Sequence, residues 1–248
     1  MEGIYKRFED LKPLSGSALK IIALVTMMID HTASCLILHT EFGNAPLLKI
    51  GPYTITLYFI LRRFVGRIAF PIYCFLITEG YRYTHDKFKY GRNLLIFAFI
   101  SEIPWNLEHT GRLVTRQLGQ NVFFTLFFGY LAICMYEKYK EDKPRQLLSL
   151  LLILAAVFIV DGNYCFEGFG FILALHILRE KKVLQAIIGV CFFGSWACGY
   201  ILAFVPINMY NGQRGFIKGR AAKYAFYLAY PVHILILYFI RLNTFGYS

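Results

Sequence analysis

The 248-residue sequence lacks the motifs of the common soluble nucleotide-binding and hydrolytic enzymes. It has no G-x-x-x-x-G-K-[ST], no G-x-G-x-x-G that follows a strand and no G-x-S-x-G, so it predicts neither a phosphate loop nor a nucleophile elbow. It has no H-x-x-x-H or H-E-x-x-H pattern, and no metal site is predicted. The six cysteines form no C-x-x-C pair, and all except Cys165 lie in apolar runs, where a thiol acts as a small hydrophobe.

Negative charge is also scarce, with 15 Asp and Glu against 26 Lys and Arg and a net charge of +11. Such an excess can indicate a nucleic-acid partner. Here, however, the basic residues form short clusters between apolar runs, which is the pattern that the positive-inside rule predicts for cytoplasmic loops. No nucleic-acid partner is therefore expected.

Apolar residues are abundant along the whole chain from residue 19 onward. The sequence is 57% hydrophobic and 18% aromatic, with a mean hydropathy of +0.51. This composition predicts an all-α, polytopic transmembrane helix bundle that forms one integral membrane domain over residues 1–248. The first residues are too polar for a cleavable signal peptide, so we expect 1–18 to be a cytoplasmic segment and the first span to act as the insertion signal.

Apolar stretches bounded by charges or by Gly, Pro and Asn predict seven clear spans, near residues 19–38, 63–81, 93–107, 121–137, 146–160, 166–178 and 224–241. The segment 53–60 is too short to cross a bilayer and is expected to be an interfacial or re-entrant helix. The stretch 183–211 is ambiguous, because a straight helix of this length would be about 43 Å long, too long for one upright span and too short for two.

Charge distinguishes two topologies for that stretch. A tight hairpin that turns at Gly194 to Gly199 gives nine spans, with 19 Lys and Arg in cytoplasmic loops and 6 on the other side. A single crossing gives eight spans and a weaker split of 16 against 9. The positive-inside rule therefore favours about nine spans, with a cytoplasmic N-terminus, over the alternative of eight.

Ionisable residues inside predicted spans are costly and usually face a bundle interior or a water-filled cavity. Asp30 and His31 lie about 17 to 18 Å along the first span. Because adjacent residues do not share a helix face, Asp30 should meet a partner from another helix. Arg67 is its expected counter-charge and His233 the alternative. The structural alternatives are a core imidazole for His31 and a snorkelling arginine for Arg67.

His233 lies about 14 Å into the last span, after Pro231, and two imidazoles at matching depth indicate proton handling. The alternative for His233 is an isolated core histidine. Asn121 begins an apolar run and suits either a helix cap or a catalytic hydrogen-bond donor. Glu79, near the inner end of its span, is expected to be structural and paired with Arg82.

The segment "YNGQRGFIKGRAAK" is the best candidate for binding phosphates. Glycines interleave with cations there, so that backbone amides and side chains can hold an anion; the candidates are Gly212, Arg214, Lys218, Arg220 and Lys223. The same loop would suit anionic lipid headgroups, and as a plain topogenic loop it needs no ligand.

Six segments taken in order resemble the TraX family: "LKIIALVTMMIDH", "GRIAFPIYCFLITEGYRYT", "SEIPWNL", "NVFFTLFFGY", "YNGQRG" and "YAFYLAYPVHILILYFI". That family is named for a conjugation protein that N-acetylates pilin, and it is similar to a wider group of polytopic acyltransferases. The resemblance implies an acyl-CoA donor such as acetyl-CoA, a catalytic intramembrane histidine and a multi-pass protein of the bacterial plasma membrane. By position, the family's motif residues fall on Asp30, His31, Gly66 through Pro71, Asn121 and His233.

The mechanism expected from these residues is acyl transfer from cytosolic acyl-CoA to an amine or hydroxyl of a peptide, sugar or lipid headgroup. His31 would be the general base or the acyl carrier, Arg67 or Asn121 would stabilise the oxyanion, Asp30 would position a partner and His233 would shuttle the proton. One rival hypothesis is a proton-coupled transporter that uses the same buried charges. Another is a non-catalytic lipid-binding scaffold.

Overall fold

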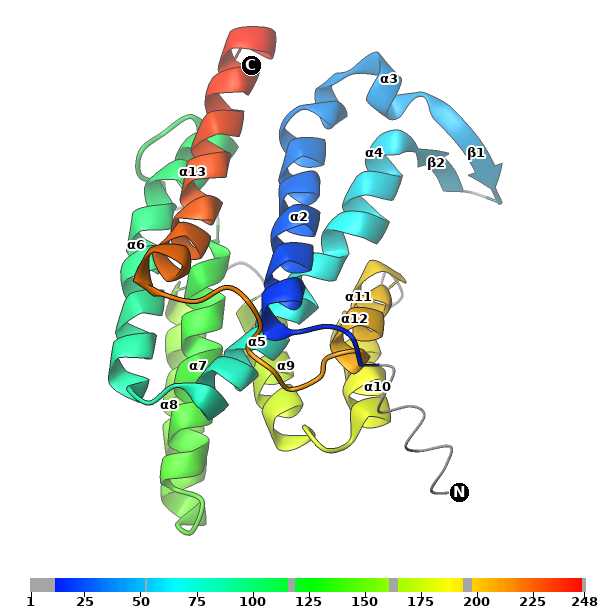
Figure 1. The fold of residues 1–248 in the computed structure, drawn as a ribbon. Helices are drawn as coiled ribbons and strands as arrows, with labels where there is room; N and C mark the ends of the chain where they lie inside the picture. Colours follow the sequence, from blue (N-terminus) through cyan, green and yellow to red (C-terminus); the bar gives the residue numbers. More distant parts are fainter. Residues whose placement is uncertain (1–11, 52, 116–118, 161–164, 194–197, 247–248) are drawn as a thin grey trace, which may run out of the picture. The chain divides into compact units, whose positions relative to one another are not determined.

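A computed structural model describes residues 12–51, 53–115, 119–160, 165–193 and 198–246, and most of these residues are helical (Figure 1). The predicted all-α class is confirmed. Within these residues, three helices are long and apolar enough to cross a membrane: Gly16–His39, Lys143–Val160 and Arg220–Phe245. The segments Phe166–Ile177, Lys182–Phe193 and Gly199–Asn208 are shorter apolar helices. The number of crossings and the orientation stay predictions.

The helices follow the predicted spans closely. Their bounds are α2 (Gly16–Cys35), α3 (Glu41–Asn44), α4 (Leu57–Phe59), α5 (Ala69–Tyr83), α6 (Lys87–Thr110), α7 (Val122–Lys138), α8 (Lys143–Val160), α9 (Cys165–Ile177), α10 (Lys182–Phe193), α11 (Cys198–Leu202), α12 (Phe204–Asn208) and α13 (Arg220–Phe245). The ambiguous stretch 183–211 contains α10, α11 and α12. The turn predicted within it falls largely on residues 194–197, which lie outside the described residues.

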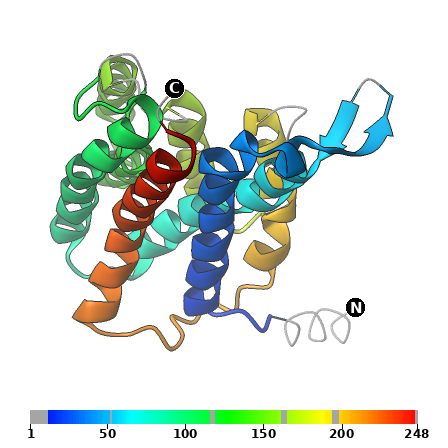
Figure 2. The ribbon, with the colours of Figure 1, turned by 90° about the horizontal axis from the view of Figure 1, so that it is seen from above.

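The prediction of a helix across 53–60 is wrong for its first half. Strand β1 (Pro46–Ile50) pairs antiparallel with strand β2 (Tyr53–Thr56), and this hairpin projects from the neighbouring helices (Figure 2). The sequence "YTIT" is rich in β-branched residues, which favour a strand. A helix begins only at α4, where the Thr56 side chain accepts a hydrogen bond from the Phe59 amide at 3.1 Å.

The chain forms two compact units. The first comprises Met1–Leu76 and Phe193–Phe226. In it α2 packs against two irregular helical segments, the π-helix η2 (Ile60–Val65) and the 3₁₀ segment η3 (Gly66–Ile68), and α11 contacts both of these segments. This unit holds the predicted residues Asp30, His31 and Arg67, together with the basic loop.

The second unit comprises Ile77–Phe192 and Tyr227–Ser248. In it α7 contacts α6, α8 and α9, and Figure 1 shows α6, α7 and α8 in green. The core between α7, α8 and α9 consists of small and large apolar side chains that interlock; its buried members are Ala132, Ile153, Val157 and Phe169. Gly129 of α7 allows close packing, because a Cβ there would overlap the Ile172 side chain of α9. This unit holds Asn121 and His233.

Candidate functional site

The Asp30 carboxylate on α2 forms an ion pair with Arg62 of η2. The distance from Arg62 Nη1 to Asp30 Oδ2 is 3.4 Å, and the Asp30 side chain is 13% exposed. The second carboxylate oxygen, Oδ1, is buried and accepts no hydrogen bond from the described residues. Arg62 is a partner of Asp30 that the sequence analysis did not single out.

Arg67 still belongs to the same site. Its charge interacts with Asp30, as do the charges of Arg62 and Arg63. The Arg67 guanidinium also lies 6.0 Å from the ring centroid of Tyr200, which in turn stacks on Phe193 with ring centroids 4.2 Å apart. Three arginine charges therefore act on one carboxylate within the helix packing.

Two glycines allow the backbones to approach closely at this site. A Cβ at Gly66 would overlap the Asp30 side chain. A Cβ at Gly199 of α11 would lie 2.5 Å from the Arg63 carbonyl oxygen and 2.7 Å from the Arg67 Cβ. Small residues therefore bring α2 and α11 against the irregular segment that carries the arginines.

His31 is half-buried on α2, one residue after the ion pair. The Ser34 hydroxyl donates to the His31 carbonyl at 3.1 Å and to the Asp30 carbonyl at 3.1 Å, which anchors the backbone of this helix turn. The role of the His31 imidazole stays a prediction.

Asn121 has the geometry of a helix cap. Its side-chain oxygen accepts from the Phe123 amide at 3.0 Å, and its side-chain nitrogen donates to the Ala98 carbonyl at 2.8 Å and to Glu102 Oε2 at 2.6 Å. Both amide protons are thereby engaged within the protein. This arrangement favours the capping role over the donation of a hydrogen bond to a substrate.

His233 is buried in α13, within the second unit. Its Nδ1 lies 2.7 Å from the Ala229 carbonyl oxygen, so Nδ1 carries a proton and Nε2 is the nitrogen that can accept one. The Tyr230 ring meets the imidazole edge to face, with centroids 5.9 Å apart. Pro231 removes one backbone hydrogen bond from this turn of the helix.

The basic loop is fixed on the N-terminus of α2. The Gly16 amide donates to the Gln213 carbonyl at 2.8 Å and the Ser17 amide to the Arg214 carbonyl at 2.9 Å. The Ser17 hydroxyl donates to the Arg214 carbonyl at 2.9 Å and accepts from the Ile217 amide at 2.8 Å. The first amides of α2 are therefore used by the protein itself, and an anion would have to be held by side chains and the remaining loop amides.

Lys20 is a further cation at this loop that the sequence did not single out. It lies one turn into α2, and its charge interacts with those of Arg214 and Lys223. Gly212 has a φ of +78° and Gly219 a φ of +91°, backbone conformations that side chains disfavour. Arg214, Lys218 and Arg220 are exposed, so the loop presents cations at its surface.

The fold and this site define a largely helical protein with apolar helices of the kind found in membrane proteins. A family model for the TraX protein matches residues 15–241, and the chain belongs to the TraX family. The chain is similar to the "Probable fimbrial assembly protein FimC, serogroup H1" of Dichelobacter nodosus, with 26% identity over 249 residues that cover 90% of this chain and 94% of that protein. No solved structure matches the chain.

Proposed function

We propose that the protein is a membrane-embedded acyltransferase that moves an acetyl or other short acyl group from cytosolic acyl-CoA to an amine or hydroxyl. The observation that carries this proposal is the Asp30–Arg62 ion pair inside an apolar helix packing, directly before His31. Charged groups in such a setting are costly and are typical of functional sites. The buried Oδ1 of Asp30, which accepts no hydrogen bond from the described residues, leaves an acceptor for a substrate or catalytic donor.

In the proposed reaction the acceptor nitrogen or oxygen attacks the thioester carbonyl while His31 removes the acceptor proton. A neutral imidazole suits this role because its pKa lies near neutrality. The tetrahedral oxyanion would be stabilised by Arg67, a contribution of about 3 to 4 kcal/mol if the donor is well aimed. The C–S bond then breaks, and the CoA sulfur takes the proton back from the imidazole. Asp30 would position the arginines.

The phosphates of CoA would bind at the basic loop, through Arg214, Lys218, Arg220 and Lys223, with Lys20 beside them. Repulsion between Lys20 and its basic neighbours supports this assignment, because an anion would relieve it. Gly212 lets the backbone turn without steric strain where the phosphates would approach.

We also propose that the protein is a multi-pass protein of the bacterial plasma membrane, with about nine spans and a cytoplasmic N-terminus. The hydrogen bonds from Gly16 and Ser17 to the 213–214 carbonyls support this count. Groups in hydrogen-bond contact lie on the same side of a membrane, so the chain crosses an even number of times between them. In the nine-span topology the chain crosses the membrane eight times between residues 17 and 213, whereas in the eight-span alternative it crosses seven times.

For the acceptor, we propose that a protein amine be tested first, because the Dichelobacter nodosus relative is named as a fimbrial assembly protein. An amino sugar or a lipid headgroup is chemically equivalent as a nucleophile and belongs in the same screen. No metal or nucleic acid takes part in this scheme.

The test is acyl transfer by the purified protein, measured as CoA release against a panel of peptide amines, amino sugars and lipid headgroups. His31→Ala should abolish transfer and keep CoA affinity within about twofold, while His85→Ala, an exposed histidine outside the site, should leave transfer unchanged. Transfer by His31→Ala at the wild-type rate would overturn the assignment of the base. Flux driven by a pH gradient in liposomes, with no CoA release, would replace the enzyme with a transporter.

A further inference from the structure

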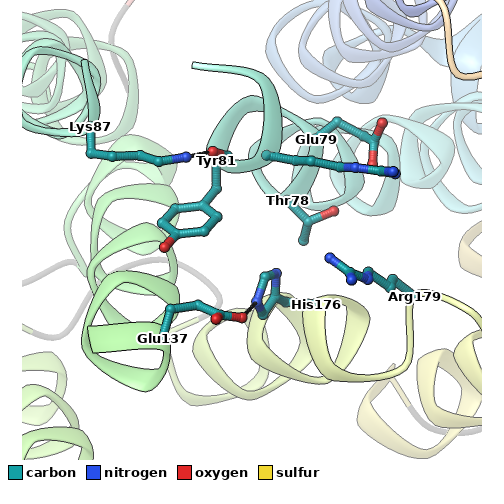
Figure 3. A pocket seen from close by; sticks show the side chains of 8 residues that line it. Thr78, Glu79, Tyr81, Lys87, Glu137, His176 and Arg179 are labelled. Atoms are coloured by element: carbon teal, nitrogen blue, oxygen red, sulfur yellow. Dashed lines mark hydrogen bonds and ion pairs between the residues drawn. The ribbon is translucent and has the colours of Figure 1, made fainter. Parts of the chain in front are cut away.

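A cavity of about 210 Å³ lies in the second unit, apart from the residues assigned above. It is lined by the C-terminal part of α5, the start of α6 and the ends of α7 and α9; the lining residues are Thr78, Glu79, Tyr81, Arg82, Lys87, Glu137, His176 and Arg179. Figure 3 shows these side chains around the cavity. The charged lining comprises three cations and two carboxylates, together with one histidine.

His176 and Glu137 form a hydrogen-bonded pair in this cavity, in which the histidine is buried and the glutamate is partly exposed. His176 Nε2 lies 2.6 Å from Glu137 Oε1, and the His176 side chain is only 7% exposed. Tyr81 packs edge to face on the imidazole, with centroids 5.5 Å apart. Because Nε2 is bound to the carboxylate, Nδ1 is the ring nitrogen left for a ligand, and it has no hydrogen-bond partner among the described residues.

Two further donors lie on the side of the imidazole away from Glu137. Figure 3 shows the Arg179 guanidinium and the Thr78 hydroxyl there. Among the described residues the Arg179 side chain pairs with the exposed Glu180, at 3.2 Å, a surface contact that a ligand can displace at little cost. The structure therefore directs an imidazole and a guanidinium toward one space.

The remaining cations are only partly neutralised. Lys87 donates to the Tyr81 carbonyl and lies 3.8 Å from the Tyr81 ring centroid, and partial burial lowers the pKa of its ammonium group. Arg82 forms no ion pair with Glu79 among the described residues, so the pairing that the sequence predicted is absent. One of the two carboxylates, Glu137, is already committed to His176.

We propose that this cavity binds a phosphate group, held by His176, Arg179, Arg82 and Lys87. A phosphate accepts several charge-assisted hydrogen bonds at once, and guanidinium groups match its oxygens in pairs. Glu137 accepts the Nε2 proton of His176 and so orients the imidazole, which leaves Nδ1 for a contact with the ligand. Sequence topology places the loops next to this cavity on the cytoplasmic side, so the phosphate comes from a free cytosolic anion, from the nucleotide end of CoA or from an inner-leaflet lipid. The proposal does not depend on the acyl-transfer chemistry at His31.

The test measures binding of inorganic phosphate to the full chain in detergent by titration calorimetry. The Arg82→Ala/Arg179→Ala variant should weaken phosphate affinity tenfold or more, because each guanidinium contact to phosphate is worth about tenfold. Arg145→Ala is the matched control: Arg145 is an exposed arginine at the start of α8 that pairs with Asp142 and does not line the cavity. This control should bind phosphate like the wild type.

The single variant Arg179→Ala guards against misfolding, since this side chain is 55% exposed and its loss should leave the melting temperature unchanged. A severalfold loss of phosphate affinity in this variant supports the site. Failure of the wild type to bind phosphate, or unchanged affinity in the double variant, overturns it.

Three further ligands identify the source of the phosphate. If the wild type binds CoA more tightly than dephospho-CoA, and the double variant binds the two equally, the phosphate belongs to the nucleotide end of CoA. Binding to vesicles with phosphatidic acid, lost in the double variant, points to lipid, and inorganic phosphate alone points to a free anion. Acyl transfer by the double variant at the wild-type rate would show that the proposed function does not need this site. Phosphate binding by a protein that transfers no acyl group would support this site and contradict the proposed function.

Discussion

The ion pair between Asp30 and Arg62 predicts that the two side chains are energetically coupled, so that their effects on the free energy of unfolding are not additive. At 3.4 Å, two unit charges interact by about 5 kcal/mol at an effective dielectric constant of about 20, and by about 1 kcal/mol in water. Desolvation offsets part of this attraction. We therefore expect a net coupling of about 1 to 3 kcal/mol between Asp30→Asn and Arg62→Gln, the range for residues in direct contact.

The coupling is measured by a double-mutant cycle on the free energy of unfolding, with denaturing detergent titrated into mixed micelles. Asp30→Asn/Arg145→Gln is the control, because Arg145 is exposed on α8, pairs with Asp142 and should be additive with Asp30 within about 0.5 kcal/mol. A coupling below about 0.5 kcal/mol for Asp30→Asn/Arg62→Gln, no larger than that of the control pair, would refute the reasoning.

Three other variants test the packing around the candidate residues. Asn121→Ala removes a helix cap and two side-chain hydrogen bonds, and should lower the unfolding free energy by about 2 to 3 kcal/mol in the same assay. Gly199→Ala should cost about 1 to 3 kcal/mol because its Cβ meets backbone atoms, whereas Gly16→Ala, where the nearest atom is 3.3 Å away, should cost less. Ser17→Ala removes two hydrogen bonds that hold the basic loop, and should weaken CoA binding severalfold by calorimetry and lower the unfolding free energy by about 1 to 3 kcal/mol.

The sequence predicts most helices because apolar length and capping residues are local signals. Ser15 precedes α2 and accepts from the Ala18 amide, and Asn121 precedes α7 and accepts from the Phe123 amide, as residues at helix starts commonly do. The hairpin at 46–56 was missed because an apolar segment of this length has no period that distinguishes a strand from a short helix.

The contacts that build the candidate sites join residues far apart in the chain, and no local pattern reports them. Ser17 and Arg214 are 197 positions apart, and Glu137 and His176 are 39 positions apart. Each of these residues is unremarkable by itself in the sequence. Lys20 likewise resembles an ordinary lysine at the end of a span until the fold brings Arg214 beside it.

The ion pair between Asp30 and Arg62 depends on an irregular helix that the hydropathy of the sequence does not reveal. A reading from hydropathy assigns Arg62 and Arg63 to a loop and leaves Arg67 as the arginine inside the span. In the structure η2 is a π-helix, and the Gly66 amide donates to the Leu61 carbonyl, a step of five residues. This wider turn changes the direction of the side chains, and Arg62 forms an ion pair with the carboxylate. Since π-turns occur frequently at functional sites, the failure of the regular-helix assumption at this point favours Asp30 and its arginines as the functional centre.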